Sequence, residues 1–305
     1  MRALLVVNPK ATATTAGVRD VLAHALASEV KLDIVQTEAR GHATSLARQA
    51  VDDGLDVVVA LGGDGTVNEV VNGLLAGGPT AGLPALAVVP GGNANVFARA
   101  LGLSASPVEA TSQLLGALAA GRRRTVGLGL ADDHWFTFCA GMGLDASVVR
   151  RVEARRASGA RSTPALYVRQ ALAQFFRSDR RGLSLTVHSP GQERVPVGLA
   201  LICNSRPWTY LGERPVVPCP DASFETGLDL FALRNLRTTT MLRQLRQILS
   251  KQPRPGGRAV LGLHDQESFL LTADRPTPLQ VDGDDLGDRT EVRFRAVPLA
   301  LDVVV

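Results

Sequence analysis

Two glycine-rich segments carry the residue types best suited to hold a phosphate group. The first, Gly62-Gly63-Asp64-Gly65-Thr66, follows an apolar run and opens a helical pattern. Glycine lets the backbone approach a ligand closely, and the amide groups at a helix start attract anions. The second segment, Pro90-Gly91-Gly92-Asn93, also follows an apolar run. The pair predicts phosphate-binding loops, and ordinary strand-to-helix turns are the alternative.

A carboxylate lies inside the first glycine loop, at Asp64. Beside a polyphosphate it is repelled unless a cation intervenes, and magnesium binds carboxylate, water and phosphate oxygens together. We therefore expect Asp64 to organise a magnesium ion through water. The alternative is a turn residue, because Gly-Asp-Gly suits a tight turn.

The elements that position these loops alternate between strand and helix. Strand-like runs at 3–7, 31–36, 56–61 and 86–89 are each followed by a helical period, at 15–28, 44–53, 66–75 and 95–101. This order predicts a parallel sheet with helices on both faces. Ligands bind such sheets at the carboxyl ends of the strands, where Asn8-Pro9-Lys10 also lies. The sequence lacks GxxxxGK[ST], and no GxGxxG follows the first strand, which excludes a P-loop enzyme and an ordinary Rossmann dehydrogenase.

Beyond about residue 125 the pattern changes to short strands separated by turns, which is typical of a β-rich domain. We therefore predict an α/β domain over residues 1–125 and a β-rich domain over 126–292. A return of residues 293–305 to the first domain is left open. The expected strands of the second half cover 126–130, 135–139, 183–189, 195–204, 228–233, 268–273 and 279–281.

Basic residues are concentrated in two stretches. Residues 150–181 hold nine arginines and two acids, and residues 234–258 hold seven basic residues and no acid. Both stretches suit anionic lipid or phosphate, compositional bias being the alternative, and neither has the aromatic residues of a nucleic-acid platform. A helical pattern over 239–250 suits an interfacial helix and equally a helix packed on a sheet. Its apolar face would hold Met241, Leu242, Leu245, Ile248 and Leu249.

The cellular location is inferred from what the sequence lacks. Its three cysteines lie far apart and form no CxxC pair, which fits reduced thiols. The N-terminal apolar run is too short for a signal peptide, and no apolar window of about 18 residues could span a membrane. We expect a cytoplasmic protein that associates peripherally with membranes.

Together these motifs resemble the diacylglycerol kinase catalytic family, which includes bacterial diacylglycerol kinases and sphingosine kinases and is distantly similar to NAD kinases. The similarity covers nearly the whole chain and implies an NAD kinase-like three-layer α/β domain that binds ATP, followed by a β-sandwich domain that covers the cleft. It also implies an ATP- and magnesium-dependent kinase that phosphorylates a hydroxyl of diacylglycerol or a related lipid. The matching segments are 62–70, 90–99, Thr37 with 41–43, 138–146, 220–229 and 280–284.

The resemblance assigns roles to particular residues. Asp284 stands where the family has the Glu of Asp-Gly-Glu and is implied as the general base, and Asp145 is implied as an acid of the segment between the domains. Asp285 is interpreted as a solvated loop acid, and Asp282 is left open between that role and the site. A second, structural magnesium would lie near Glu225, the one carboxylate that remains of the family's pair. The implied ATP contacts are Asn8, Pro9, Lys10, Thr37, Gly62, Gly63, Asp64, Gly65, Thr66, Asn68, Gly91, Gly92 and Asn93.

Two other functions remain open from the sequence. One is an NAD kinase-like enzyme with a soluble acceptor, against which stand the β-rich second half and the Asp282-Gly283-Asp284 motif. The other is a nucleotide-binding protein without turnover, for which the shorter carboxylate at position 284 is the support. The expected partner is a lipid substrate at a membrane surface and not a nucleic acid, with a homodimer left open.

Overall fold

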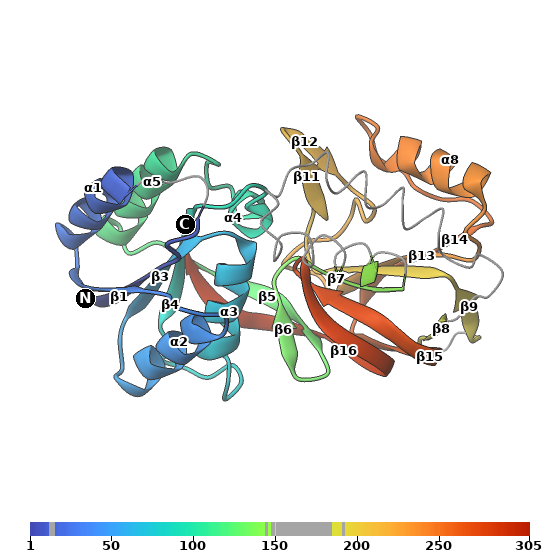
Figure 1. Ribbon diagram of the computed structural model, residues 1–305, viewed down its shortest axis with the longest axis horizontal. Coiled ribbons are helices and arrows are strands. Elements are labelled where there is room, and N and C mark those ends of the chain that lie inside the picture. Colours follow the sequence, from blue (N-terminus) through green and yellow to red (C-terminus); the bar gives the residue numbers. More distant parts are fainter. Residues whose placement is uncertain (12–15, 144–145, 148–149, 151–184, 191–192) are drawn as a thin grey trace. The chain divides into compact units, whose positions relative to one another are not determined.

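The computed structural model of this chain describes residues 1–305 except 12–15, 144–145, 148–149, 151–184 and 191–192 (Figure 1). The chain divides into two compact units. Unit 1 consists of Met1–Gly127 with Leu299–Val305, and unit 2 consists of Leu128–Pro298. The C-terminal residues thus join unit 1 from Leu299 onward, later than position 293 from which a return was considered.

A parallel sheet forms the centre of unit 1. Strand β1 lies between β2 and β3, and β3 also pairs with β4. Every residue of β3 and β4 is buried, as expected for parallel strands covered on both faces. The end of β16 adds a further parallel strand beside β4. The strand bounds are Arg2–Val7 for β1, Lys31–Gln36 for β2, Val57–Gly62 for β3, Ala85–Pro90 for β4 and Asp284–Val304 for β16.

Helices cover both faces of this sheet. The pair α1 and α5 lies on one face and the pair α2 and α3 on the other (Figure 1), so the expected three-layer α/β architecture is confirmed. The sequence interpretation missed α5, although Ser106 caps it by accepting a hydrogen bond from the Glu109 amide and Pro107 occupies its first turn, both recognised start signals. The bounds are Ala16–Ala27 for α1, His42–Asp52 for α2, Asp64–Leu74 for α3, Val96–Ala100 for α4 and Pro107–Ala119 for α5.

Unit 2 is built mainly from antiparallel strands, so the predicted β-rich second half is confirmed. Strand order in its main sheet is β14-β13-β10-β7-β15-β16; β8 and β9 extend from β15, β5 and β6 from β16, and β11 with β12 forms a separate hairpin. The bounds are Arg123–Ala131 (β5), His134–Phe136 (β6), Cys139–Gly143 (β7), Leu185–His188 (β8), Val195–Val197 (β9), Leu199–Cys203 (β10), Thr209–Leu211 (β11), Arg214–Val216 (β12), Leu228–Leu233 (β13), Val260–Gln266 (β14) and Ser268–Val281 (β15).

Alternate residues of β10 and β13 enter two different apolar clusters. Ala200 and Ile202 face the main core of unit 2, whereas Leu199 and Leu201 face a second cluster that includes Ile248. Helix α8 (Thr238–Ile248) therefore covers the second face of these strands. None of the helices in the described part of the chain is both long and apolar enough to cross a membrane.

Candidate active site

The sheet of unit 1 brings four loops to one edge, because its strands are parallel and all four loops follow strand ends. The loop after β1 is tied to the end of β3. The amide of Asn8 donates to Leu61 O at 3.0 Å, and the side chain of Asn8 donates to Thr66 Oγ1 at 2.9 Å. The structure thus brings Asn8 and Thr66 together, as the resemblance implied for two residues of one site.

The two glycine loops contact each other directly. The amide of Gly91 donates to Gly62 O at 2.7 Å. A Cβ atom added to Gly92 would lie 2.7 Å from the Cα atom of Gly63, closer than unbonded carbon atoms approach. Part of the glycine pattern is therefore explained by the packing of one loop on the other, and not only by room for a ligand.

Asn95 holds the second loop in shape. Its side chain accepts from the Gly92 amide and donates to Gly92 O, both at 2.8 Å. It is 5% exposed and has a φ of 48°, a left-handed conformation that asparagine adopts more readily than most residues. The predicted ligand residue Asn93 is exposed instead. Sequence reasoning missed Asn95 as the organising residue.

Asp64 is the first residue of α3 and links the two glycine loops. Its Oδ1 accepts a hydrogen bond from the Phe97 amide of α4 at 3.3 Å. The first hydrogen bonds within α3 run from the amides of Thr66 and Val67 to Gly63 O. Amide groups before that point have no acceptor inside the helix and are directed at its N-terminal end, where an anion is stabilised.

Glu69, in the second turn of α3, ties α2 to the same site. Its two carboxylate oxygens accept from the amides of Gly41 at 2.9 Å and Ala43 at 3.2 Å. A carboxylate at a helix start satisfies the unpaired amides there, so Glu69 caps α2. Sequence reasoning assigned no role to Glu69, although it lies inside the Gly62–Val70 motif.

Other residues predicted to contact ATP lie after β1, after β2 and inside α3. The amide of Thr37 continues the β1–β2 pairing by donating to Val7 O at 2.8 Å. Asn68 is 4% exposed, and its Oδ1 accepts from Asn72 at 3.1 Å. Pro9 and Lys10 are exposed after β1, and the Lys10 amide donates to Asn8 Oδ1 at 2.9 Å.

In unit 2, Asp282 is buried and accepts hydrogen bonds from Thr137, Phe138 and Cys139. Its Oδ2 receives the amide and hydroxyl of Thr137 at 2.7 and 2.8 Å. Its Oδ1 receives the amides of Phe138 and Cys139 at 3.1 and 3.0 Å. Of the two roles left open for Asp282, the solvated loop acid is wrong: the carboxylate fixes the β15–β16 turn onto the start of β7.

The turn itself points the chain back into β16. Asp282 and Gly283 have φ values of 48° and 86°, and Val281 pairs with Asp284, which is a two-residue hairpin of the type that Asp-Gly favours. Asp285, interpreted as a solvated acid, instead forms an ion pair with Arg150 at 2.8 Å. Arg150 also pairs with Asp288 at 2.7 Å. Asp284 therefore lies between two anchored carboxylates.

The Arg150 ion pairs also change the interpretation of the first basic stretch. Hydrogen bonds to Asp285 and then to Asp288 raise the pKa of the Arg150 guanidinium, so this charge is committed within the protein. The rest of that stretch, residues 151–181, lies outside the described residues, as does Asp145.

A second buried carboxylate of unit 2 is Asp229, which is 3% exposed. Its Oδ1 accepts from His264 Nδ1 at 2.8 Å and from the Asp265 amide at 3.0 Å. Burial raises the pKa of Asp229, and the side-chain hydrogen bond to Asp229 raises the pKa of His264. The predicted second metal ligand, Glu225, accepts from Ser223 Oγ at 2.7 Å. Over the residues that the structure describes, no three His, Cys, Asp or Glu side chains are grouped to hold a metal ion.

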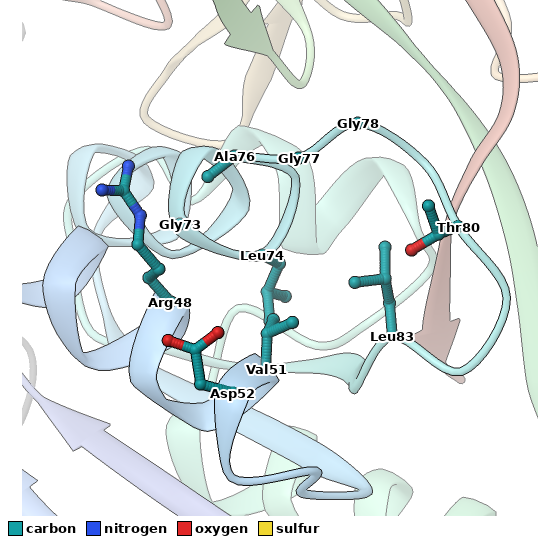
Figure 2. Close-up of a pocket in the computed structure, with 10 residues that line it drawn as sticks. All are labelled: Arg48, Val51, Asp52, Gly73, Leu74, Ala76, Gly77, Gly78, Thr80 and Leu83. Carbon is teal, nitrogen blue, oxygen red and sulfur yellow. The ribbon is translucent and has the colours of Figure 1, made fainter.

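A separate groove lies at the far ends of α2 and α3, shown in Figure 2. Arg48, Asp52 and the loop through Gly78 and Thr80 line it. Both helices begin at the glycine-loop edge and end at this groove, so the groove is separate from the two glycine loops.

The residues of unit 1 fit a magnesium–nucleotide complex. The glycines at 62, 63, 91 and 92 let the two loops pack together at this edge, the start of α3 directs amides outward, and Asp64 is half-exposed beside them. One carboxylate is too few to bind magnesium alone, so the ion would take its other ligands from phosphate and water.

Comparison with known proteins agrees with this geometry. The sequence model of the diacylglycerol kinase catalytic domain matches residues 2–129. The diacylglycerol kinase of Bacillus subtilis (strain 168) is 39% identical over 107 residues, which are 35% of this chain and 33% of that protein. A probable lipid kinase YegS-like from Chromohalobacter salexigens is 37% identical over 150 residues, 49% of this chain and 46% of that protein. The matches thus span a third to a half of these relatives' length.

Solved structures show the same fold over the full chain. A diacylglycerol kinase from Bacillus anthracis str. Sterne superposes with a TM-score of 0.73 at 19% identity, covering 99% of this chain and 96% of that one. An NAD kinase from Archaeoglobus fulgidus in complex with ATP gives a TM-score of 0.54 at 12% identity, covering 100% and 94%. The resemblance expected from the glycine motifs is confirmed: residues 2–129 match the sequence model of the diacylglycerol kinase catalytic domain.

Proposed function

We propose that this protein transfers the γ-phosphoryl group of ATP to a hydroxyl group of diacylglycerol or a related lipid. The observation that carries the proposal is the pair of interlocked glycine loops with Asp64 at the start of α3, in a domain matched to the diacylglycerol kinase family. Phosphoryl transfer depends mainly on positioning and on stabilising charge, and this edge of the sheet supplies both.

Each group of the site has a task in this proposal. The amides at the start of α3 hold phosphate oxygens, and Asp64 holds the magnesium ion through water. Magnesium, when bound, neutralises charge on the transferring phosphoryl group. The start of the loop after β1, held in place by Asn8, contacts the nucleotide at the same edge of the sheet.

Asp284 is the proposed general base, which accepts the proton of the attacking lipid hydroxyl. Its neighbours support the assignment, because Asp282 and Asp285 are both committed to holding the hairpin in place. A base must lie within hydrogen-bonding reach of the proton that it removes, and a firmly anchored turn on both sides limits the movement of Asp284.

The test is a transfer assay with labelled ATP and magnesium over acceptors in mixed micelles: diacylglycerol, ceramide and sphingosine, with NAD as a soluble acceptor. We expect label in a lipid product. Asp64→Asn should remove most activity and weaken the magnesium dependence, because the amide keeps an oxygen for the Phe97 amide but loses the charge. Asp52→Asn, at the opposite end of α2, is the matched control.

The outcomes separate the candidate functions. Label in NAD alone would support the NAD kinase-like alternative, and ATP binding without any product would support a nucleotide-binding protein without turnover. Near wild-type turnover of Asp64→Asn would refute the metal role.

A further inference from the structure

Helix α8 buries one narrow stripe and exposes apolar residues beside it. Gln244 and Ile248 are the buried positions, and Gln244 Nε2 donates to Gly256 O at 3.0 Å. Leu242 is 62% exposed and Leu245 is 50% exposed. The apolar face expected from the sequence is therefore divided: Met241, Ile248 and Leu249 pack on the second apolar cluster, whereas Leu242 and Leu245 are left exposed.

Two exposed leucines alone would be ordinary, since folded proteins expose single apolar residues freely. Here they are three residues apart and so lie side by side on the helix. In addition, all the charged residues of the surrounding segment, 234–258, are basic. All seven basic residues of segment 234–258 are exposed and the segment has no acid: Arg234, Arg237, Arg243, Arg246, Lys251, Arg254 and Arg258.

These charges are available to an external partner. Across the described residues, none of the seven forms an ion pair with an acidic side chain. Arg243 and Arg246 are on α8 itself, next to the exposed leucines. An acidic partner surface with an apolar layer beneath it fits both features, and an anionic lipid bilayer has that chemistry.

We propose that α8 is the surface by which this protein lies on an anionic membrane. Leu242 and Leu245 enter the boundary between headgroups and acyl chains, and the surrounding arginines pair with lipid phosphates. The inference deepens the proposed function, since a lipid acceptor is reached from a membrane surface. Only the biological reason for membrane binding rests on that proposed function. Binding itself requires no turnover.

The experiment measures co-sedimentation with vesicles, in the absence of ATP, so a failure of kinase activity leaves the binding result interpretable. Phosphatidylcholine vesicles with and without phosphatidylglycerol are compared at low and high salt. We expect stronger binding to the anionic vesicles, weakened by salt through screening. Leu242→Ser with Leu245→Ser, and separately Arg243→Gln with Arg246→Gln, should each reduce the partition coefficient about tenfold or more.

Matched controls carry the same chemical changes on other helices. Val108→Ser removes an exposed apolar side chain of α5, 58% exposed, and Arg48→Gln removes an exposed charge of α2; both should bind vesicles as the wild type does. Circular dichroism checks that the variants are folded, which is expected because the changes are at exposed positions.

Three results would overturn the inference. Wild-type binding by the double-leucine variant would show that α8 does not enter the membrane. Equal binding of the wild type to neutral and anionic vesicles at low salt would remove the role of the charges. A change of oligomeric state in the leucine variants, measured by light scattering, with vesicle binding unaltered, would assign this face to a second copy of the chain.

Discussion

The hydrogen bonds that Asp282 accepts from Thr137, Phe138 and Cys139 make a quantitative prediction about the stability of unit 2. In Asp282→Asn, one oxygen becomes an amide nitrogen that can no longer accept. The better orientation turns this nitrogen toward Thr137, whose hydroxyl can rotate to accept from it. The Thr137 amide, buried in the wild type, then has no acceptor.

The size of the effect follows from that count. One unsatisfied buried amide costs about 1–3 kcal/mol, and hydrogen bonds to a charged group are worth more than those to a neutral one. We therefore expect Asp282→Asn to lower the free energy of unfolding by about 2–3 kcal/mol. Asp282→Ala, which leaves every donor of the site without this acceptor, should cost about 3–5 kcal/mol, in the range of broken buried networks.

Urea unfolding followed by tryptophan fluorescence measures this in unit 2 alone, because both tryptophans, Trp135 and Trp208, lie there. The dependence on urea should keep its slope while the midpoint falls. Asp274→Asn, the same change at an exposed position of β15, is the control and should be neutral. Equal midpoints for Asp282→Asn and Asp274→Asn would refute the claim that this carboxylate anchors the turn.

Two further predictions concern Asp284 and the pair that His264 forms with Asp229, all in unit 2. Asp284→Asn should lower kcat by about 100-fold, as expected for loss of a general base, while ATP binding stays nearly unchanged. Asp285→Asn should keep kcat within several-fold of the wild type. An inactive Asp285 variant beside an active Asp284 variant would place the base at position 285. The pKa of His264 is raised by its bond to Asp229, so this bond stabilises the fold below the unfolded pKa of about 6.5 and its contribution is lost as pH rises through the folded pKa. The stability difference between wild type and His264→Gln, under about 1 kcal/mol for so exposed a side chain, should therefore shrink from pH 6 to pH 8.5; a constant difference would contradict the charged pair.

The sequence by itself determined the features that depend on neighbouring residues. The alternation of buried strands with helices gave the parallel sheet, and the glycine motifs gave the position of the two loops after β3 and β4. The Asp-Gly dipeptide gave the tight turn before Asp284. Each of these follows from backbone freedom and hydrophobic period over about ten residues, which can be judged without the rest of the chain.

The tertiary structure alone decided which polar side chains are structural. Asp282 bonds to residues 143 to 145 positions away, and Asp285 to Arg150, 135 positions away. No local pattern distinguishes an anchored acid from a solvated one in the run Asp282-Gly283-Asp284-Asp285. The same holds for α8: its period predicts an apolar face, but only the packing on β10 and β13 decided that Ile248 is buried and Leu242 is left in water. A side chain's environment is set by whatever the fold places beside it, and that information is spread over the whole chain.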